Sequence, residues 1–281
     1  MPKNDVFILT SYNQVFGKGH FFRMCTLGKF LEEKGVSVKI FSNEIPNGIP
    51  LDVLNLFVTE ADVDAKVIVR DKRDSSAQEI TKLKQNAKVI VIDDIGSGRD
   101  VADKAIDFLP NLKYEYNDNF FVPGFSYYNY INSNKDKIIE KQKQILLYSP
   151  CKEDNNFLEM LQKTGYEIKI AGENGVVFEK ELLLSKVFVS HFGVSFFEAN
   201  FAKTKIASIA ISDYHLDLAV NVQKEMGLCN VGLYPNLNYG MLIDYIKKEM
   251  ANESISININ TLAKEIEKKV ENVYTEIIQF L

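Results

Sequence analysis

The sequence predicts an α/β protein made of two Rossmann-like halves, each an open and mostly parallel sheet covered by helices. Short apolar runs of strand length alternate with stretches whose apolar residues recur every three or four positions, as on one face of a helix. Several runs, such as residues 89–92, are apolar at every position, which is typical of parallel strands buried on both faces. The alternation is interrupted once by a polar, charged stretch and then begins again, which indicates two domains.

In the first half, β-branched and continuous apolar segments indicate strands, and apolar residues at helical spacing indicate helices. Residues 36–41 alternate as a strand does, and Ile80 and Leu83 fall on one side of a helical stretch. The expected helices are residues 24–34 and 75–85, and the expected strands are residues 6–10, 36–41, 67–69, 89–92 and 105–109.

The polar stretch at residues 129–143 is interpreted as a linker, or as a linker running into a short solvated helix. The expected domains are therefore residues 1–135 and 144–281, the second ending in a closing C-terminal helix. In this half the expected strands are residues 145–148, 167–171, 186–190 and 206–211, and the expected helices are residues 157–163, 195–202, 216–226, 239–250 and 262–281.

Composition narrows the class of protein. With 281 residues, 46% of them hydrophobic, the chain is long enough to bury two cores. Its net charge of −5 argues against a general role on nucleic acid or anionic membranes. No apolar stretch approaches the roughly 20 residues that span a bilayer, and the first residues carry no secretory signal, so a cytoplasmic protein is expected.

Because Cys25, Cys151 and Cys229 lie far apart, neither a zinc site nor a disulfide framework is indicated, and Cys25 and Cys229 are expected in apolar helical surroundings.

One segment carries the strongest chemical signal. Residues 17–23 read Gly-Lys-Gly-His-Phe-Phe-Arg and lie between the first expected strand and its helix. Glycines at such a turn let the backbone pass close to a ligand, and the N–H groups of a helix start attract an anion. His20 adds the side chain that changes charge near neutral pH. The combination predicts a phosphorylated or diphosphate-linked substrate with a proton-transferring group beside it.

The chain has three histidines, His20, His191 and His215, and each follows an expected strand. Ligands of open parallel sheets bind at that edge, so we expect His20 to act as a general base on water or an acceptor hydroxyl. The alternative for His20 is a hydrogen bond to a loop carbonyl, and a structural role is the default for the other two. A zinc ion shared by all three is a weaker alternative because no acidic partners can be assigned to them.

Five short motifs occur in order along most of the chain. They are Gly17-x-Gly19-His20-x-x-Arg23-x-x-x-Leu27, Asp71-x-x-Asp74-Ser75, Ile92-Asp93-Asp94-x-Gly96 with Ala102-Asp103, Gly124-Phe125-Ser126-Tyr127, and Ser190-x-x-Gly193-x-Ser195-x-x-Glu198-Ala199. Together they resemble the PseG/SpsG family of nucleotide-sugar hydrolases, the UDP-sugar hydrolases of pseudaminic acid synthesis and their relatives in spore-coat polysaccharide synthesis. The last motif is also similar to one in MurG-type glycosyltransferases.

The resemblance implies a GT-B architecture, with two Rossmann-like domains facing across a cleft and the nucleotide held by the second. It implies a metal-independent hydrolase without a cofactor, which cleaves the anomeric bond of a UDP-linked deoxy- or amino-sugar in surface-glycan or nonulosonic-acid-type biosynthesis. His20 would be catalytic. The other implied contacts are Gly17, Gly19, Arg23, Asp71, Asp94 and Tyr127 for the substrate, and Ser190, Gly193, Ser195, Glu198 and His215 for the nucleotide.

Several of these residues have ordinary structural alternatives. Ser195 and Glu198 have the spacing of a capping box, and aspartates at strand ends often cap helices or turns. Arg23 can form a surface salt bridge, and Tyr127 belongs to an aromatic cluster that can pack between domains.

Two departures from the family pattern keep the function open. Residues 149–154 read Ser-Pro-Cys-Lys-Glu-Asp where the family usually has a glycine-rich loop near the diphosphate; Pro150 lacks an N–H donor, although Lys152 could supply a point charge. After residue 211 the chain has His215 in a segment without the family's Asn-Gln pair. Hydrolysis is the first hypothesis, transfer by a GT-B glycosyltransferase using the same cleft is the alternative, and a non-catalytic protein that binds a nucleotide sugar or a partner is the third.

Overall fold

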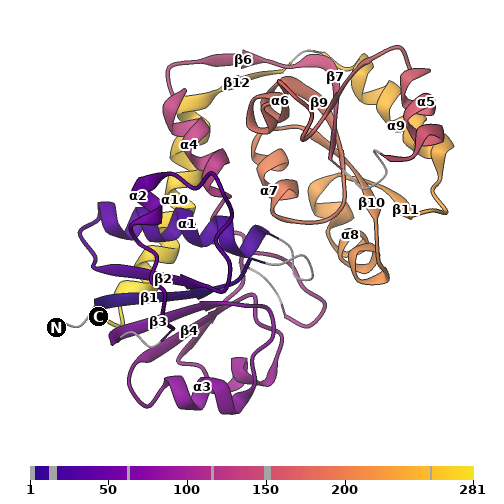
Figure 1. Cartoon of the computed structure of the whole chain (residues 1–281). Coiled ribbons are helices and arrows are strands. Elements are labelled where there is room, and N and C mark those ends of the chain that lie inside the picture. The colour runs from indigo at the N-terminus through magenta and orange to yellow at the C-terminus, as the bar shows by residue number, and fades with distance from the viewer. Residues whose placement is uncertain (1–3, 13–17, 62–63, 115–116, 149–152, 254) are drawn as a thin grey trace. The chain divides into compact units, whose positions relative to one another are not determined.

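The computed structural model describes residues 4–12, 18–61, 64–114, 117–148, 153–253 and 255–281. The chain forms two compact units, here called unit 1 (Met1–Tyr128 with Glu265–Leu281) and unit 2 (Asn129–Lys264). Each unit contains a parallel sheet of five strands with helices on its faces (Figure 1). The predicted α/β class with two Rossmann-like units is therefore confirmed.

The sheet of unit 1 has the strand order β2-β1-β3-β4-β5. Parallel pairing brings the carboxyl ends of β1, β3 and β4 to one edge, where Thr10 pairs with Asp71 and Arg70 with Val91. The last strand stops at Ile106, three residues before the expected end. The strands are β1 (Asn4–Thr10), β2 (Val38–Ser42), β3 (Ala65–Asp71), β4 (Lys88–Ile92) and β5 (Lys104–Ile106).

Helices cover both faces of this sheet, which explains its continuous apolar strands. Along β3, Val67 and Val69 pack with Leu27 of α1, whereas Ile68 packs with Ile80 of α3 on the opposite face (Figure 1). The first helix begins five residues earlier than expected, so that His20 and Arg23 lie in its first turns. The helices are α1 (Gly19–Glu33), the one-turn α2 (Leu51–Leu54), α3 (Ala77–Leu83) and the 3₁₀ turn η1 (Ser97–Val101).

The long C-terminal helix α10 (Ile259–Ile278) begins in unit 2 and ends in unit 1. Val273 and Ile277 join the buried core that α1 forms with β1, β3 and β4, and the Tyr274 ring meets the Phe30 ring edge-on at 6.0 Å. The structure therefore differs from the predicted division of the chain, which placed the whole helix in the second domain. The physical reason is that the apolar stripe of its second half completes the core of unit 1.

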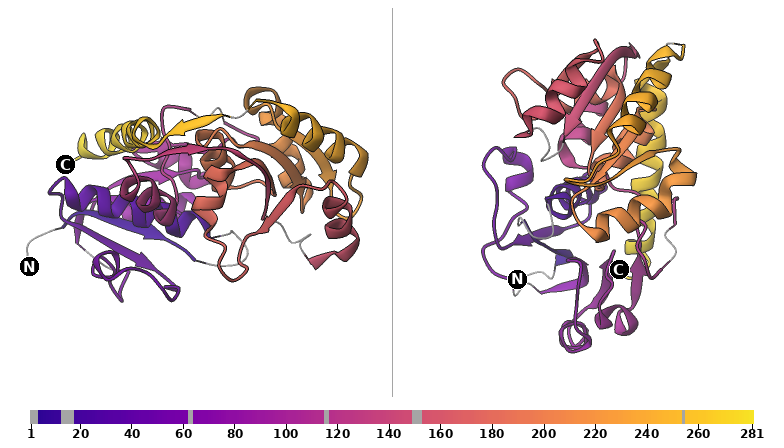
Figure 2. Two further views of the ribbon diagram at one scale, coloured as in Figure 1. Left: turned by 90° about the horizontal axis from the view of Figure 1, so that it is seen from above. Right: turned by 90° about the vertical axis from the view of Figure 1, so that its right-hand side faces the viewer.

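The sheet of unit 2 has the order β11-β10-β9-β7-β8, and α5 and α9 bury their apolar residues against one face of it (Figures 1 and 2). Cys229 begins a strand, so its expected helical surroundings are wrong, although both it and Cys25 are buried and free. The strands are β7 (Gln142–Tyr148), β8 (Glu167–Ile170), β9 (Ser185–Ser190), β10 (Lys205–Ala210) and β11 (Cys229–Leu233), and the helices are α5 (Asn155–Gln162), α6 (Phe178–Leu184), α7 (Val194–Phe201), α8 (Asp213–Met226) and α9 (Tyr239–Ala251).

The stretch expected to be a linker is largely ordered secondary structure. Helix α4 (Phe125–Ser133) occupies its beginning, and β6 (Ile138–Glu140) pairs antiparallel with β12 (Ser256–Asn258). Polar composition is misleading here, because single buried apolar side chains, Ile131 in α4 and Ile257 in β12, anchor these elements to the core. None of the helices within the described ranges has the length and apolar character needed to cross a membrane.

Candidate active site

His20 and Asp71 form a tight pair at the carboxyl edge of the first sheet. The Nδ1 atom of His20, in the first turn of α1, lies 2.6 Å from Oδ1 of Asp71, the last residue of β3. Burial by itself would raise the pKa of Asp71, but the charges and hydrogen bonds of Arg23 and His20 outweigh it and lower that pKa to about 2. An ionised carboxylate only accepts hydrogen bonds, so Nδ1 carries the proton and Nε2 keeps the lone pair that a general base needs.

Arg23 is buried completely and spends its donors on the same carboxylate and a second one. Its Nε and one terminal nitrogen each lie 2.6 Å from the two oxygens of Asp71, and the other terminal nitrogen lies 2.5 Å from Asp93 Oδ2. The guanidinium also lies over the Phe108 ring, 5.0 Å from its centroid. The surface salt bridge weighed for Arg23 is therefore wrong. Because the Arg23 side chain is fully buried beside His20, it has no exposed surface that a sugar could contact.

Asp93 completes this group, which we call the His20 network: His20, Arg23, Asp71 and Asp93. Its Oδ1 accepts backbone N–H groups of Phe108 at 2.7 Å and Leu109 at 3.1 Å. Burial raises the pKa of Asp93, while the charge of Arg23 opposes that rise. The sequence motif contained Asp93, but the predicted substrate contact was its neighbour Asp94.

Asp94 belongs to a different network on the opposite face of the sheet. It is fully buried, and its Oδ1 accepts the N–H groups of Ser75 at 3.2 Å and Gly96 at 2.8 Å. Arg70 lies 3.2 Å from its other oxygen. We call Arg70, Asp94 and their partners the Arg70 network. Arg70 also donates to the carboxylate of Glu79 and to the carbonyls of Lys72 and Asp74.

The backbone of Asp93 explains which aspartate faces His20. Alternation along β4 sends Val89 and Val91 to the α3 face, and Asp93 would follow them. Its φ of 48° is left-handed instead, which aspartate tolerates better than most residues. The turn reverses the alternation, so that Asp93 reaches Arg23 on the α1 face and Asp94 reaches Arg70 on the α3 face.

In unit 2, four of the five predicted nucleotide residues lie from the end of β9 into α7, and the fifth, His215, lies in the first turn of α8. Helix α7 begins at Val194, its N-cap is Gly193, and no side chain caps it. The predicted capping-box alternative for Ser195 and Glu198 is therefore wrong, because Ser195 already lies inside the helix. Glu198 is buried at 5% exposure in the same helix.

Three aromatic rings lie near the carboxyl ends of strands: Tyr148 is the last residue of β7, His191 follows β9, and His215 lies in the helix after β10. The ring of His191 lies 5.7 Å from that of Tyr148 and 5.8 Å from that of His215. Burial and the neighbouring His215 lower the pKa of His191 to about 4, so it is neutral at pH 7. The backbone N–H of His215 donates to Ser212, the N-cap of α8. Sequence reasoning left His191 out of the predicted site, although its position after a strand was visible.

The remaining predicted residues have less distinctive places. Gly19 is the first residue of α1, Tyr127 is buried in α4, and the hydroxyl of buried Ser190 donates to the carbonyl of His191. Gly17 and the loop at residues 149–152, with Pro150, Cys151 and Lys152, lie outside the described residues.

A metal ion has no evident place in either unit as described. The described residues contain no group of three or more His, Cys, Asp or Glu side chains that could hold one. Arg23 occupies the space between Asp71 and Asp93.

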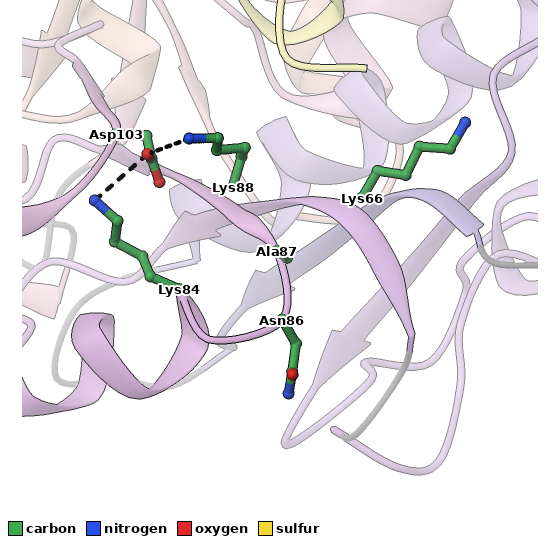
Figure 3. Close-up of a pocket in the computed structure, with 6 residues that line it drawn as sticks. All are labelled: Lys66, Lys84, Asn86, Ala87, Lys88 and Asp103. Carbon is green, nitrogen blue, oxygen red and sulfur yellow. Dashed lines mark hydrogen bonds and ion pairs between the residues drawn. The ribbon is translucent and has the colours of Figure 1, made fainter.

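An open hollow lies at the opposite end of the first sheet, near the amino ends of β3 and β4. In it Lys84 and Lys88 converge on Asp103, while Lys66 points away (Figure 3). Lys66 instead pairs with Asp5 at 2.7 Å. Two carboxylates therefore pair with three lysines and leave one net positive charge, carried by side chains that are open to solvent.

Comparison with known proteins places the fold in a known class. No model of a protein family and no curated protein matches the sequence. Among solved structures, Acinetobacter baumannii MurG aligns with a TM-score of 0.61 at 10% identity over 99% of this chain and 100% of its own. A putative UDP-N-acetylglucosamine 2-epimerase from Listeria monocytogenes aligns at 0.56 and 10% over 98% and 96%, and Arabidopsis thaliana UGT89C1 complexed with UDP at 0.54 and 10% over 99% and 100%. The chain has a GT-B-like fold. At this identity the likeness supports the MurG-type relation as one of architecture, and does not distinguish a PseG/SpsG hydrolase from other members of the fold.

Proposed function

We propose that the protein is an enzyme that cleaves the anomeric C–O bond of a nucleotide-activated sugar, with His20 as general base and water as the nucleophile. The observation that carries this proposal is the His20–Asp71 pair at 2.6 Å on the carboxyl edge of the sheet of unit 1. The GT-B-like fold, and solved neighbours whose titles name UDP and a UDP-sugar epimerase, support a sugar nucleotide as the substrate. The PseG/SpsG resemblance favours UDP and a deoxy- or amino-sugar.

The proposed chemistry is a displacement at the anomeric carbon. The nucleophile's O–H gives its proton to Nε2 of His20 as its oxygen bonds to the carbon, while the C–O bond to the diphosphate breaks and the electron pair leaves with the nucleotide. Asp71 holds Nδ1–H, fixes the ring and stabilises the imidazolium that forms. Such base assistance contributes roughly 10²- to 10⁴-fold in rate.

We assign the nucleotide to unit 2. The first turn of α7, with Gly193 as its N-cap and no side-chain cap, offers backbone N–H groups to a diphosphate. Glu198 is the proposed partner of the ribose hydroxyls, and Ser190, Ser195 and His215 are proposed to lie near the nucleotide. Because His191 is neutral at pH 7, we assign the stabilisation of the leaving diphosphate to the backbone N–H groups of the helix start.

Transfer to an acceptor hydroxyl is the second candidate. It is favoured by neighbours that include a structure titled glycotransferase of kitacinnamycin, with a TM-score of 0.55 over the full length of both chains at 10% identity. The proton transfer to His20 is the same in both reactions, because water and an alcohol each present one O–H to the base.

The deciding experiment measures free UDP after incubation with UDP-sugars, with and without alcohol acceptors. Release by the wild type without an acceptor, lost in His20→Ala, supports hydrolysis, and release only with an acceptor supports transfer. The third hypothesis is a protein without turnover that binds a nucleotide sugar or a partner. In its nucleotide-binding form UDP raises the melting temperature while no sugar is released, and in its partner-binding form UDP leaves the melting temperature unchanged. If UDP, CDP and GDP all leave the melting temperature unchanged, the nucleotide assignment is wrong.

A further inference from the structure

We propose that Asp93 is a positioning residue for His20, acting through Arg23, and that its negative charge stabilises the imidazolium formed when His20 takes a proton. This inference rests on the proposed role of His20 as the base. It concerns Arg23 and Asp93, the two members of the His20 network other than the imidazole and the carboxylate that accepts its proton.

The first step of the argument is geometric. Arg23 grips both oxygens of Asp71, and its remaining terminal nitrogen is fixed by Asp93 at 2.5 Å. One guanidinium nitrogen lies only 3.1 Å from His20 Nδ1. Both nitrogens are donors, so this contact adds no hydrogen bond, and the Nδ1 proton has Asp71 as its acceptor. Asp93 therefore sets where Arg23 lies, Arg23 sets where Asp71 lies, and Asp71 sets the ring.

The second step concerns the charge of Asp93. Its Oδ2 faces Arg23, and its Oδ1 faces the N–H groups of Phe108 and Leu109. All three partners are donors, and a protonated acid would need an acceptor for its own O–H. This geometry therefore holds Asp93 as a carboxylate.

The third step is the charge balance around the imidazole. Within the described residues, the charged groups of this network are Arg23 from α1, Asp71 from β3 and Asp93 from the turn after β4, which acts on His20 through its charge and through Arg23. One guanidinium and two carboxylates leave one net negative charge, which an imidazolium cancels. Because Arg23 and Asp71 alone are neutral as a pair, Asp93 supplies that excess charge, and its effect is large in a buried site.

The fourth step is the unusual backbone of Asp93. Its left-handed φ of 48° moves the side chain from the α3 face to the α1 face, where His20 and Arg23 lie. With ordinary alternation the charge would face away from the imidazole. The local conformation is thus what brings the second carboxylate into the network.

The test is a proton NMR titration of the imidazole of His20, one of three histidines, assigned with His20→Ala. Asp93→Asn removes the charge and keeps an oxygen that can accept from Arg23, while its NH₂ group replaces the oxygen that accepts from Phe108 and Leu109. We expect the imidazole to titrate about one pH unit lower in Asp93→Asn than in the wild type. Asp93→Glu, which keeps the charge, should titrate close to the wild type. A titration in Asp93→Asn within about 0.2 unit of the wild type would overturn the proposal.

Asp107→Asn is the matched control. Asp107 is a buried carboxylate at the same sheet edge, and its two oxygens pair with Arg99 at 2.8 and 2.6 Å. It makes no contact with Arg23 or His20 within the described residues. Its variant should leave the imidazole titration unchanged, and an equal shift in both variants would count against a specific role for Asp93.

Activity gives the second readout. In Asp93→Asn the acidic limb of the pH profile of kcat/KM should move to lower pH, and the plateau should fall by up to about tenfold because the base is weaker. If the wild type releases no UDP from any sugar, the proposed function fails, whereas the NMR titration still decides the role of Asp93.

Arg23→Lys covers the case in which Asp93→Asn does not fold. Lysine keeps the positive charge but loses the fork that holds Asp71, so the acidic limb should stay in place while the plateau falls about tenfold or more. A wild-type plateau in Arg23→Lys would overturn the positioning part of the proposal.

Discussion

The two faces of the first sheet carry two networks with similar parts and different consequences. Adjacent residues, Arg70 with Asp71 and Asp93 with Asp94, divide between them because neighbouring side chains point to opposite faces. On the α1 face, the His20 network encloses an imidazole between a carboxylate and a guanidinium. On the α3 face, the Arg70 network is joined mainly to backbone groups, the N–H of Ser75 and Gly96 and the carbonyls of Lys72 and Asp74.

The difference teaches that a buried arginine–aspartate pair at a strand end can serve different roles, and that the partners of the pair decide between them. Backbone partners make the Arg70 network a brace for the turns that follow β3 and β4. The His20 network, by contrast, contains a titratable ring, which can accept or donate a proton. Breaking either network should therefore lower stability, but only breaking the His20 network should lower the rate.

The largest expected effect comes from removing the ring itself. His20→Ala should lower the rate of UDP release about 10²- to 10⁴-fold, because the carboxylate oxygens of Asp71 and Asp93 are already occupied by Arg23 and backbone donors. UDP should still raise the melting temperature as in the wild type, since the proposed nucleotide contacts lie in unit 2. A rate within a few-fold of the wild type would show that His20 is not the base.

The second prediction sets the two aspartates against each other. Asp71→Asn should lower kcat about 10²-fold or more, because an amide does not stabilise the imidazolium and can favour the wrong tautomer. Asp94→Asn should leave kcat within about twofold but lower the stability of unit 1 by about 1–3 kcal/mol. Steady-state rates and chemical unfolding of both variants check this. Equal losses of kcat in the two would remove the distinction between the networks.

The third prediction uses acid. The pKa of Asp71 lies at about 2 in the folded protein, below its ordinary value of 3.8, because Arg23 and His20 outweigh the effect of burial. The unfolded chain thus takes up this proton at higher pH, so the stabilisation is complete above about pH 4 and is lost as the pH falls through 2. The ionised Asp71 contributes on the order of 2 kcal/mol to the free energy of unfolding.

Urea unfolding of wild type and Asp71→Asn between pH 5 and pH 2 measures this effect. The gap between the two proteins should shrink as the pH falls. A gap that stays constant over that range would mean that Asp71 is not held ionised by its partners.

The smallest effect is expected from the turn that the Arg70 network holds. A Cβ on Gly98 would lie 2.0 Å from Ser75 Oγ and 2.6 Å from Ile80 Cγ1, so η1 and α3 pack without room for a methyl group. Gly98→Ala should cost about 1–2 kcal/mol of stability by overpacking and leave kcat unchanged. Gly240→Ala in α9, whose Cβ would lie 3.7 Å from Asn238 Oδ1, is the control for a site with room for a methyl group. A fall in kcat for Gly98→Ala would show that the α3 face also serves catalysis.

Much of the fold follows from the sequence because it depends on local apolar patterns. The runs at 6–10 and 89–92 form strands, and the spacing at 216–226 forms a helix, as expected. The placement of the second half of α10 does not follow, because an apolar stripe does not say which of two cores it completes. Elements held by one or two apolar side chains in polar surroundings, such as β6 and β12, could not be predicted, because so few apolar residues form no periodic pattern.

The candidate site shows the same boundary. His20, Arg23 and Asp71 could be selected because each lies near the end of a strand or the start of a helix, where parallel sheets gather side chains. The choice between Asp93 and Asp94 could not be made, because period-two alternation fails at a left-handed residue and the sequence does not announce that conformation for aspartate. The burial of Arg23 was equally hidden, since the two carboxylates that neutralise it lie 48 and 70 residues further along the chain.

The division of unit 1 between the two ends of the chain also bears on how the protein is made. During synthesis, the sheet that carries Asp71 and Asp93 leaves the ribosome long before residues 265–281, whose Val273 and Ile277 close its core. Apolar surface on α1 that packs against α10, such as the Phe30 ring against Tyr274, stays exposed while the whole of unit 2 is translated. The nascent chain therefore offers chaperones a target in unit 1 until its last segment arrives.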